Sequence, residues 1–202
     1  VELQDLFAWH GYDNAIIFGH ALEGNLHFVI TPDFGDPAEV RGYHAFMDEL
    51  CHMVVEKYDG SLKAEHSTGR NMAPYVALEW GAEAYALMRR IKDLIDPEGL
   101  LNPGVILNED PEIHVKHLKS MAAVDPLVDR CIECGFCEPV CPSRDLTLTP
   151  RQRIVALRER ARLENADGAA ALAALGPLEY AVQDTCAGDG LCALRCPVGI
   201  DT

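Results

Sequence analysis

Seven of the eight cysteines lie in two short segments in the last third of the 202-residue chain. The first segment has the spacing Cys131-x2-Cys134-x2-Cys137-x3-Cys141, and a proline follows its last cysteine. Three closely spaced thiolates can each reach a different iron of a four-iron cluster, and the fourth belongs to the pattern that ligates the other cluster of a pair. Zinc sites usually use two well-separated pairs, so the spacing favours iron–sulfur clusters over zinc or unligated thiols.

The second segment, Cys186-x5-Cys192-x3-Cys196 followed by proline, repeats the first except that Asp189 stands in place of a second cysteine. A carboxylate is a harder ligand than a thiolate, so iron bound through Asp189 is expected to be the more labile. The site can hold a 4Fe-4S cluster with an oxygen ligand or a 3Fe-4S cluster. The alternative, that Asp189 is an ordinary loop residue between two glycines, stays open.

Crossed ligation between the two segments predicts two clusters. The first, a 4Fe-4S cluster, takes Cys131, Cys134, Cys137 and Cys196. The second takes Cys141, Cys186 and Cys192, with Asp189 or solvent completing it. A pair of clusters carries single electrons, so we expect the oxidation chemistry to take place at another site nearby.

Three histidines and a glutamate in the first half of the chain are candidates for that other site. His20 and His27 lie on either side of a turn-rich segment, and Glu65-His66 follows a short stretch with strand character. Two imidazoles and one carboxylate with open positions can hold a divalent metal that polarises a substrate oxygen. The alternative that these are isolated structural histidines stays open.

The elements that would position these residues form an α+β arrangement over residues 1–107. Short apolar runs predict strands over 14–18, 25–31 and 61–65. Asp36-Pro37 begins a helix, and a second helix runs from about Pro74 to Asp96. The order strand–strand–helix–strand–helix predicts a sheet covered on one side.

The rest of the chain divides into a polar linker over 108–125 and a mainly α-helical, ferredoxin-like iron–sulfur domain over 126–202. Thr149-Pro150 and Gln152 have the form of a capping box that starts a helix ending near Leu163. Six of the 12 arginines lie between Arg144 and Arg162, and we interpret this stripe as a solvated helix face.

Composition limits the partners and the compartment. A net charge of −15 argues against a nucleic-acid partner, and no apolar run is long enough for a transmembrane segment. An odd set of closely spaced cysteines without a secretion signal argues against a disulfide framework. We therefore expect reduced thiols and a cytoplasmic protein, either free or bound peripherally at a membrane.

Three segments resemble the C-terminal half of FAD-linked D-2-hydroxyacid dehydrogenases, of the D-lactate and D-2-hydroxyglutarate type. They are residues 20–27, residues 62–74, which read LKAEHSTGRNMAP, and residues 96–104, which read DPEGLLNPG. The cysteine-bearing part resembles the iron–sulfur region of large bacterial fusions in that family. The fold class implied is the C-terminal part of an FAD-linked oxidase substrate domain followed by the iron–sulfur domain.

The resemblance implies roles for four residues. His20, His27 and Glu65 correspond to the ligands of zinc or a similar divalent ion, and His66 corresponds to the general base that takes the proton of the substrate hydroxyl. The reaction implied is oxidation of a small D-2-hydroxy acid to the 2-oxo acid by hydride transfer to FAD. The electrons then leave one at a time through the two clusters.

The same resemblance places Arg70 on the substrate carboxylate, Asn25 beside the metal and Asn102 near the flavin. It implies an FAD-binding domain as a partner, since no dinucleotide-type glycine fingerprint occurs here, and the chain is expected to be an internal fragment, inactive alone. An electron acceptor, either a quinone, a cytochrome or a carrier protein, is a further expected partner. The alternatives are a non-catalytic iron–sulfur electron-transfer subunit that docks a separate flavoenzyme, and a zinc-stabilised scaffold.

Overall fold

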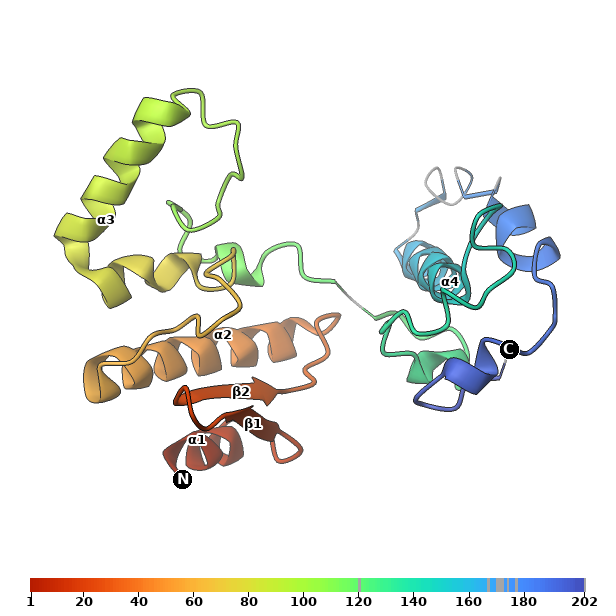
Figure 1. The fold of residues 1–202 in the computed structure, drawn as a ribbon, viewed down its shortest axis with the longest axis horizontal. Helices are drawn as coiled ribbons and strands as arrows, with labels where there is room; N and C mark the ends of the chain where they lie inside the picture. The colour runs from red at the N-terminus through yellow and green to blue at the C-terminus, as the bar shows by residue number, and fades with distance from the viewer. Residues whose placement is uncertain (120, 167, 170–172, 174, 177, 202) are drawn as a thin grey trace. The chain divides into compact units, whose positions relative to one another are not determined.

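A computed structural model describes residues 1–119, 121–166, 168–169, 173, 175–176 and 178–201 (Figure 1). The chain divides into two compact units, Val1–Ser120 and Met121–Thr202. In the first unit the described elements are helix α1 (Glu2–Trp9), strands β1 (Ile16–His20) and β2 (Asn25–Val29), helix α2 (Pro37–His52) and helix α3 (Val76–Ile95). In the second unit the described α-helix is α4 (Pro150–Asn165).

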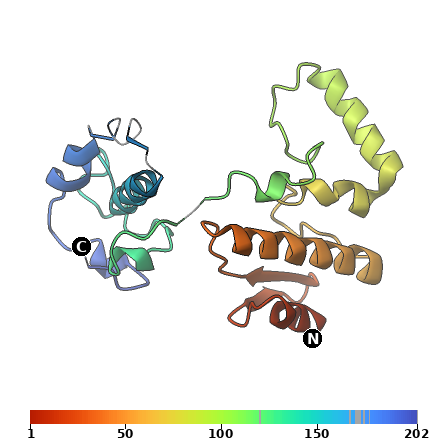
Figure 2. The same cartoon turned by 180° about the vertical axis from the view of Figure 1, so that it is seen from behind.

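Strands β1 and β2 form an antiparallel hairpin that runs alongside α2 (Figures 1 and 2). Both predicted N-terminal strands are therefore present, with bounds within two residues of the expected ones. One face of the hairpin carries Ile17 and Phe28, which pack on the core of the unit. Because successive side chains of a strand point to opposite faces, the other face is left for different residues.

Helix α2 begins where the sequence predicts. Asp36 is its N-cap, with the Oδ1 atom accepting a hydrogen bond of 2.7 Å from the backbone N–H of Ala38, and Pro37 occupies the first helical position. The helix continues as a π-helical turn over Met53–Lys57. Its buried face supplies most of the core.

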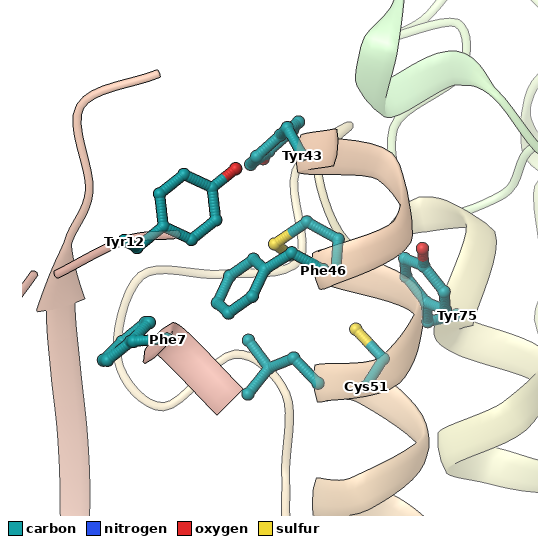
Figure 3. Packing of buried hydrophobic residues seen from close by; sticks show 8 residues of the cluster. Phe7, Tyr12, Tyr43, Phe46, Cys51 and Tyr75 are labelled. Carbon is teal, nitrogen blue, oxygen red and sulfur yellow. The ribbon is translucent and has the colours of Figure 1, made fainter. Parts of the chain in front are cut away.

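The core of the first unit joins α1, the hairpin and α2 (Figure 3). Phe46 is completely buried, and its ring centroid lies 5.6 Å from that of Phe7 and 5.1 Å from that of Tyr12. The buried members of this core cluster are Phe7, Tyr12, Tyr43, Phe46, Met47, Leu50, Cys51 and Tyr75. This cluster packs the hairpin against α2.

The predicted strand over residues 61–65 is wrong, because the described sheet contains only β1 and β2. Ala64 has a φ of 40° and Ser67 a φ of 64°, both in the left-handed region that an extended strand excludes. The segment is instead a series of turns. The expected strand–strand–helix–strand–helix order is thus corrected to a helix, a hairpin and two further helices.

The second predicted helix exists but is kinked. A 3₁₀ turn over Ala73–Tyr75 leads into α3, and Gly81 interrupts α3 with a φ of 79° and a ψ of 160°. A residue with a side chain adopts that conformation only with strain, so glycine makes the kink possible. Near the C-terminal end of α3 the apolar side chains of Leu94 and Ile95 are exposed.

The segment after α3, which still belongs to the first unit, contacts the rest of that unit at several points. The Tyr85 hydroxyl donates to the Asn108 carbonyl at 2.9 Å. His114, in a 3₁₀ turn over Ile113–Val115, is 4 % exposed and lies 2.9 Å from a ring nitrogen of His44. Burial lowers the pKa of His114, so the imidazole is held neutral at neutral pH. The part of the expected linker up to this turn is therefore anchored.

The second unit is organised around α4. Thr149 and Gln152 form the predicted capping box, with the Thr149 hydroxyl accepting from the Gln152 N–H and the Gln152 side chain accepting from the Thr149 N–H. The other described turns are 3₁₀ turns over Val128–Arg130 and Ala193–Arg195 and a π-helical turn over Tyr180–Asp184. No described residue of this unit lies in a strand. No helix in the described part of the chain is both long and apolar enough to cross a membrane.

The packing of α2 generates a stability prediction. Leu50 is 7 % exposed in the core, whereas Leu94 on α3 is 84 % exposed. Leu50→Ala should lower the free energy of unfolding by about 2–5 kcal/mol, because it removes apolar contacts and leaves a cavity. Leu94→Ala, the matched control, should change it by less than about 0.5 kcal/mol. Urea unfolding measures both, and equal effects would contradict the described core.

Candidate functional site

The free face of the hairpin carries two histidines side by side. In the antiparallel register Phe18 pairs with His27 and His20 pairs with Asn25, so His20 and His27 are diagonal neighbours on one face. Their ring centroids are 5.5 Å apart. Gly19, next to His20 in β1, has to be glycine because a Cβ there would lie 2.2 Å from the carbonyl oxygen of Asn25.

The loop over residues 61–72 brings a third ligand-type residue, Glu65, to this face. Its start is held by Glu79 of α3, whose carboxylate accepts from Ser61 at 2.8 Å and from Lys63 at 3.2 Å. Its end is held by the Ile106 N–H, which donates to the carbonyl of Gly69 at 3.2 Å. The turns that replace the expected strand are therefore what direct Glu65 toward the hairpin.

His20, His27 and Glu65 converge on one point. The Glu65 Oε1 atom lies 3.4 Å from His20 Nε2 and 3.5 Å from His27 Nε2, and one ligand atom from each residue lies within 4.8 Å of the others. A tetrahedral zinc ion with bonds of about 2.0–2.2 Å holds its ligand atoms about 3.3–3.6 Å apart. The two measured separations fall in that range.

The burial of His27 and the lack of a hydrogen-bond partner for its Nε2 atom in the described part of the chain also fit a bound cation. The residue is 9 % exposed, and its Nε2 atom is buried without a hydrogen-bond partner among the described residues. A buried nitrogen without a partner is costly, and a metal ion bound to its lone pair would remove that cost. These three residues therefore have the donor types, the spacing and the unsatisfied atom that a divalent ion requires.

His66 adjoins the same cluster. Its Nε2 atom lies 3.7 Å from Glu65 Oε1, and its ring centroid lies 4.7 Å from that of His27. The His66 side chain is 72 % exposed, so a bound molecule can reach it. Arg70, four residues further on, is exposed. Its guanidinium is one of the charges that lower the pKa of the Asp110 carboxyl.

The two asparagines have different surroundings. The Asn25 side chain accepts a hydrogen bond of 3.0 Å from the backbone N–H of His20 and so closes the hairpin turn beside the cluster. Asn102 has a φ of 46° in the turn after α3. It lines an apolar hollow that also includes Thr68 of the site loop and Trp80 of α3. A role in cofactor binding remains a prediction for both.

In the second unit, the cysteines predicted for the first cluster line a single hollow of about 440 Å³, its open mouth included. They are Cys131, Cys134, Cys137 and Cys196. Among the described residues none of these four forms a disulfide. Burial raises the pKa of the Cys137 thiol, so this thiol must lose its proton as iron binds. The remaining lining is mostly apolar, as a site for an inorganic cluster requires.

The residues predicted for the second cluster line a separate hollow of about 830 Å³, again with its mouth. Cys141, Cys186, Cys192 and Asp189 all contribute to it, and Cys192 also reaches the first hollow. The Asp189 Oδ1 atom accepts from the Leu191 N–H at 3.1 Å. That bond fits a loop role and leaves the second carboxylate oxygen for another partner. The structure thus brings together the two groups that crossed ligation requires.

A hydrogen-bond network around Thr185 holds the two cysteine segments against each other. The Ser143 hydroxyl donates to the Thr185 carbonyl at 2.5 Å, and the Thr147 hydroxyl donates to the Thr185 hydroxyl at 2.7 Å. The Arg153 guanidinium also donates to that hydroxyl, at 3.1 Å. Since Ser143 follows Cys141-Pro142 and Thr185 precedes Cys186, the network sets the two sides of the second hollow. On the first hollow, Arg130 donates to the Val198 carbonyl.

Two arginines of α4 are structural parts of these sites, and the interpretation of the arginine stripe as a solvated face is wrong for them. Arg153 is 7 % exposed and Arg158 is 4 % exposed. Arg158 forms an ion pair of 2.9 Å with Glu133 and donates at 3.0 Å to the carbonyl of Cys131. Arg160 and Arg162, with about half of each side chain exposed, do match the expectation.

Comparison with known protein families identifies both parts of the chain. The family described as FAD linked oxidases, C-terminal domain, matches residues 2–106, which is just over half of the chain. The family described as a 4Fe-4S dicluster domain matches residues 127–200. The first match contains the histidine–glutamate cluster, and the second contains all seven clustered cysteines.

Curated relatives match the same parts. A D-2-hydroxyglutarate dehydrogenase of Stutzerimonas stutzeri is 34% identical over 107 residues, covering 52% of this chain and 23% of the relative. The glycolate oxidase subunit GlcD of Bacillus subtilis is 33% identical over 100 residues, covering 49% and 21%. A D-2-hydroxyglutarate dehydrogenase of Escherichia coli is 30% identical over 186 residues, covering 80% and 18%.

The chain therefore spans about a fifth of the length of these relatives. A match over 80% of the chain must include cysteine-bearing residues, so the Escherichia coli relative resembles both units. No solved structure matches the chain significantly.

The geometry of the histidine–glutamate cluster predicts the effect of removing one ligand-type residue. In the full-length protein, His27→Ala should lower the divalent metal content at least about tenfold, because it removes the buried and unsatisfied donor. His52→Ala is the matched control, since His52 lies on α2 and pairs with Asp48 instead. Elemental analysis after dialysis measures both. Equal metal contents in the two variants would rule out this site.

The two hollows predict a selective loss of clusters. Cys196→Ala should remove the first cluster and Cys141→Ala the second, although each cysteine lies in the sequence segment of the opposite site. Cys51→Ala should remove neither, because Cys51 is fully buried in the first unit and burial raises its pKa to about 12. Iron and acid-labile sulfide per chain, with electron paramagnetic resonance, report the outcome. Loss of the same cluster in both variants would contradict crossed ligation.

Proposed function

The chain belongs to the FAD linked oxidase C-terminal domain family, joined to a 4Fe-4S dicluster domain, and from this premise we propose that it is part of an enzyme that oxidises a D-2-hydroxy acid to the 2-oxo acid. The observation that carries the proposal is the convergence of His20, His27 and Glu65 next to an accessible His66. A metal-binding cluster with an accessible imidazole beside it suits removal of a proton from a hydroxyl group.

Each residue of the first site has a proposed task. His20, His27 and Glu65 hold a divalent ion, zinc or similar, and His66 accepts the proton of the substrate hydroxyl at its ring nitrogen. A bound ion would polarise the substrate oxygen, a bound FAD would accept the hydride, and iron–sulfur clusters would carry the electrons away singly. Arg70 pairs with the substrate carboxylate, since its guanidinium is exposed and a guanidinium binds a carboxylate through two parallel hydrogen bonds.

We propose that the flavin lies toward the hollow lined by Asn102, Thr68 and Trp80. Two features support this position for the flavin. The lining of the hollow is mostly apolar, and it includes Thr68, which belongs to the same loop as Glu65. Asn25 supports the site from the other side by fixing the turn that carries His20. The FAD-binding domain that the relatives' family name implies is the partner required for turnover.

The electron path is proposed to run through the second unit. Cys131, Cys134, Cys137 and Cys196 hold a 4Fe-4S cluster. Cys141, Cys186 and Cys192, with Asp189 or solvent, hold a second cluster of three or four irons. The domain division proposed is 1–107, a connection over 108–125, and 126–202. A quinone, a cytochrome or a carrier protein takes the electrons at the end of this path.

The substrate class follows from the names of the relatives. Several are D-2-hydroxyglutarate or D-lactate dehydrogenases, and one is a glycolate oxidase subunit. All three names contain a small 2-hydroxy acid. We propose D-2-hydroxyglutarate or D-lactate as the substrate class here, with a panel of D-2-hydroxy acids as the means of separating them.

The role of His66 gives the experiment that tests this function. In the full-length protein, His66→Ala should slow flavin reduction by the hydroxy acid by about 10²–10⁴-fold, because the proton acceptor is gone. Cluster content should be unchanged, since His66 and the cysteines belong to separate units. Anaerobic stopped-flow absorbance measures the rate, and His52→Ala is the control. Unchanged flavin reduction in His66→Ala would favour a non-catalytic electron-transfer subunit instead.

A further inference from the structure

Arg153 occupies an unusual position for a charged residue. It lies in the first turns of α4 with 7 % of its surface exposed, and its side chain lines the second hollow together with Cys141, Cys186 and Asp189. Most arginines remain at the surface unless a partner compensates their charge. The surroundings of this guanidinium therefore need an explanation.

The partners of Arg153 inside the described protein are incomplete. One terminal nitrogen donates to the Thr185 hydroxyl at 3.1 Å, while the Nε atom is buried without a hydrogen-bond partner. No described Asp or Glu forms an ion pair with it, in contrast to Arg158, which is equally buried and pairs with Glu133 at 2.9 Å. A buried cation without a counter-anion is strongly unfavourable.

The anionic groups that face the same hollow are the ligand-type residues of the second site. Cys141, Cys186, Cys192 and Asp189 line it, and as thiolates and a carboxylate they would bring several negative charges there. An iron–sulfur cluster held by four such ligands is itself a net anion, and reduction adds one more negative charge. The missing counter-charge of Arg153 and the unbalanced charge of such a cluster therefore belong to the same hollow.

We infer that Arg153 is a positioning residue that supplies the buried counter-charge of the second cluster and raises its reduction potential. This inference rests on the proposed function, because it requires a cluster at that site. A nearby fixed cation favours the state that carries the additional electron, and low-dielectric surroundings strengthen the effect. The hydrogen bond from Arg153 to Thr185 also holds the guanidinium beside the segment that leads into Cys186.

Redox titration of the full-length protein under anaerobic conditions, followed by electron paramagnetic resonance, tests the inference. Arg153→Met should lower the equilibrium constant for reduction of one cluster at least about tenfold, which corresponds to a fall of about 59 mV for a one-electron couple. The other cluster should change less than about threefold. Arg153→Lys, which keeps the charge, should restore most of the potential.

Arg160→Met is the matched control. Arg160 lies on the same helix, but its side chain is half exposed and paired with Glu164, so both potentials should stay at the wild-type values. Loss of the second cluster in Arg153→Met but not in Arg153→Lys would also support a charge requirement.

Three results would decide against the inference or its premise. Two clusters with unchanged potentials in Arg153→Met would overturn the inference while leaving the proposed function intact. Loss of the second cluster in both Arg153→Met and Arg153→Lys would overturn it as well, because the shape of the guanidinium and not its charge would then be needed. Wild-type protein without iron and inorganic sulfide would instead reject the proposed clusters themselves.

Discussion

The contact between Thr185 and its partners is the interaction on which the cysteine-bearing unit depends. This unit has no described strand and little regular structure beyond α4, so few backbone ladders hold its loops. Thr185 accepts from Thr147 and Arg153 and donates to the carbonyl of Ala181, which satisfies its hydroxyl completely. The segments before Cys186 and after Cys141 meet there. Ligands far apart in the sequence can then face one hollow, and metal binding can stabilise the rest.

In the first unit the candidate ligands are positioned differently, by the two-residue period of a β-hairpin. One face buries Phe28 and Ile17 on the core, and the opposite face presents His20 and His27. Packing on the core therefore fixes the strands that carry the two imidazoles, although neither histidine belongs to the core cluster. Glu65 is brought to them by strained turns of a loop, a common arrangement where a scaffold is rigid and the chemistry sits on connecting segments.

Spacing along the sequence indicated which candidate ligands lie together in the structure, because cluster-type cysteine patterns are local; their role as ligands stays a prediction. The hairpin, the start of α2 and the Thr149 capping box were predictable for the same reason. The strand over 61–65 was not, since its side chains alternate acceptably and only the left-handed φ of Ala64 breaks it. Arg153 and Arg158 were misjudged because charge suggests solvent, whereas here Arg153 lines the second hollow and Arg158 pairs with Glu133 and donates to the Cys131 carbonyl.

Under the proposed function, electrons from a 2-hydroxy acid would pass through FAD to the iron–sulfur clusters of the same protein. The most direct measurement mixes the anaerobic full-length protein with D-2-hydroxyglutarate or D-lactate, without any external acceptor, and freezes samples over time. The account predicts bleaching of the flavin absorbance followed by paramagnetic signals of reduced clusters. Flavin that becomes reduced while every cluster stays oxidised, at potentials that would permit transfer, would contradict it.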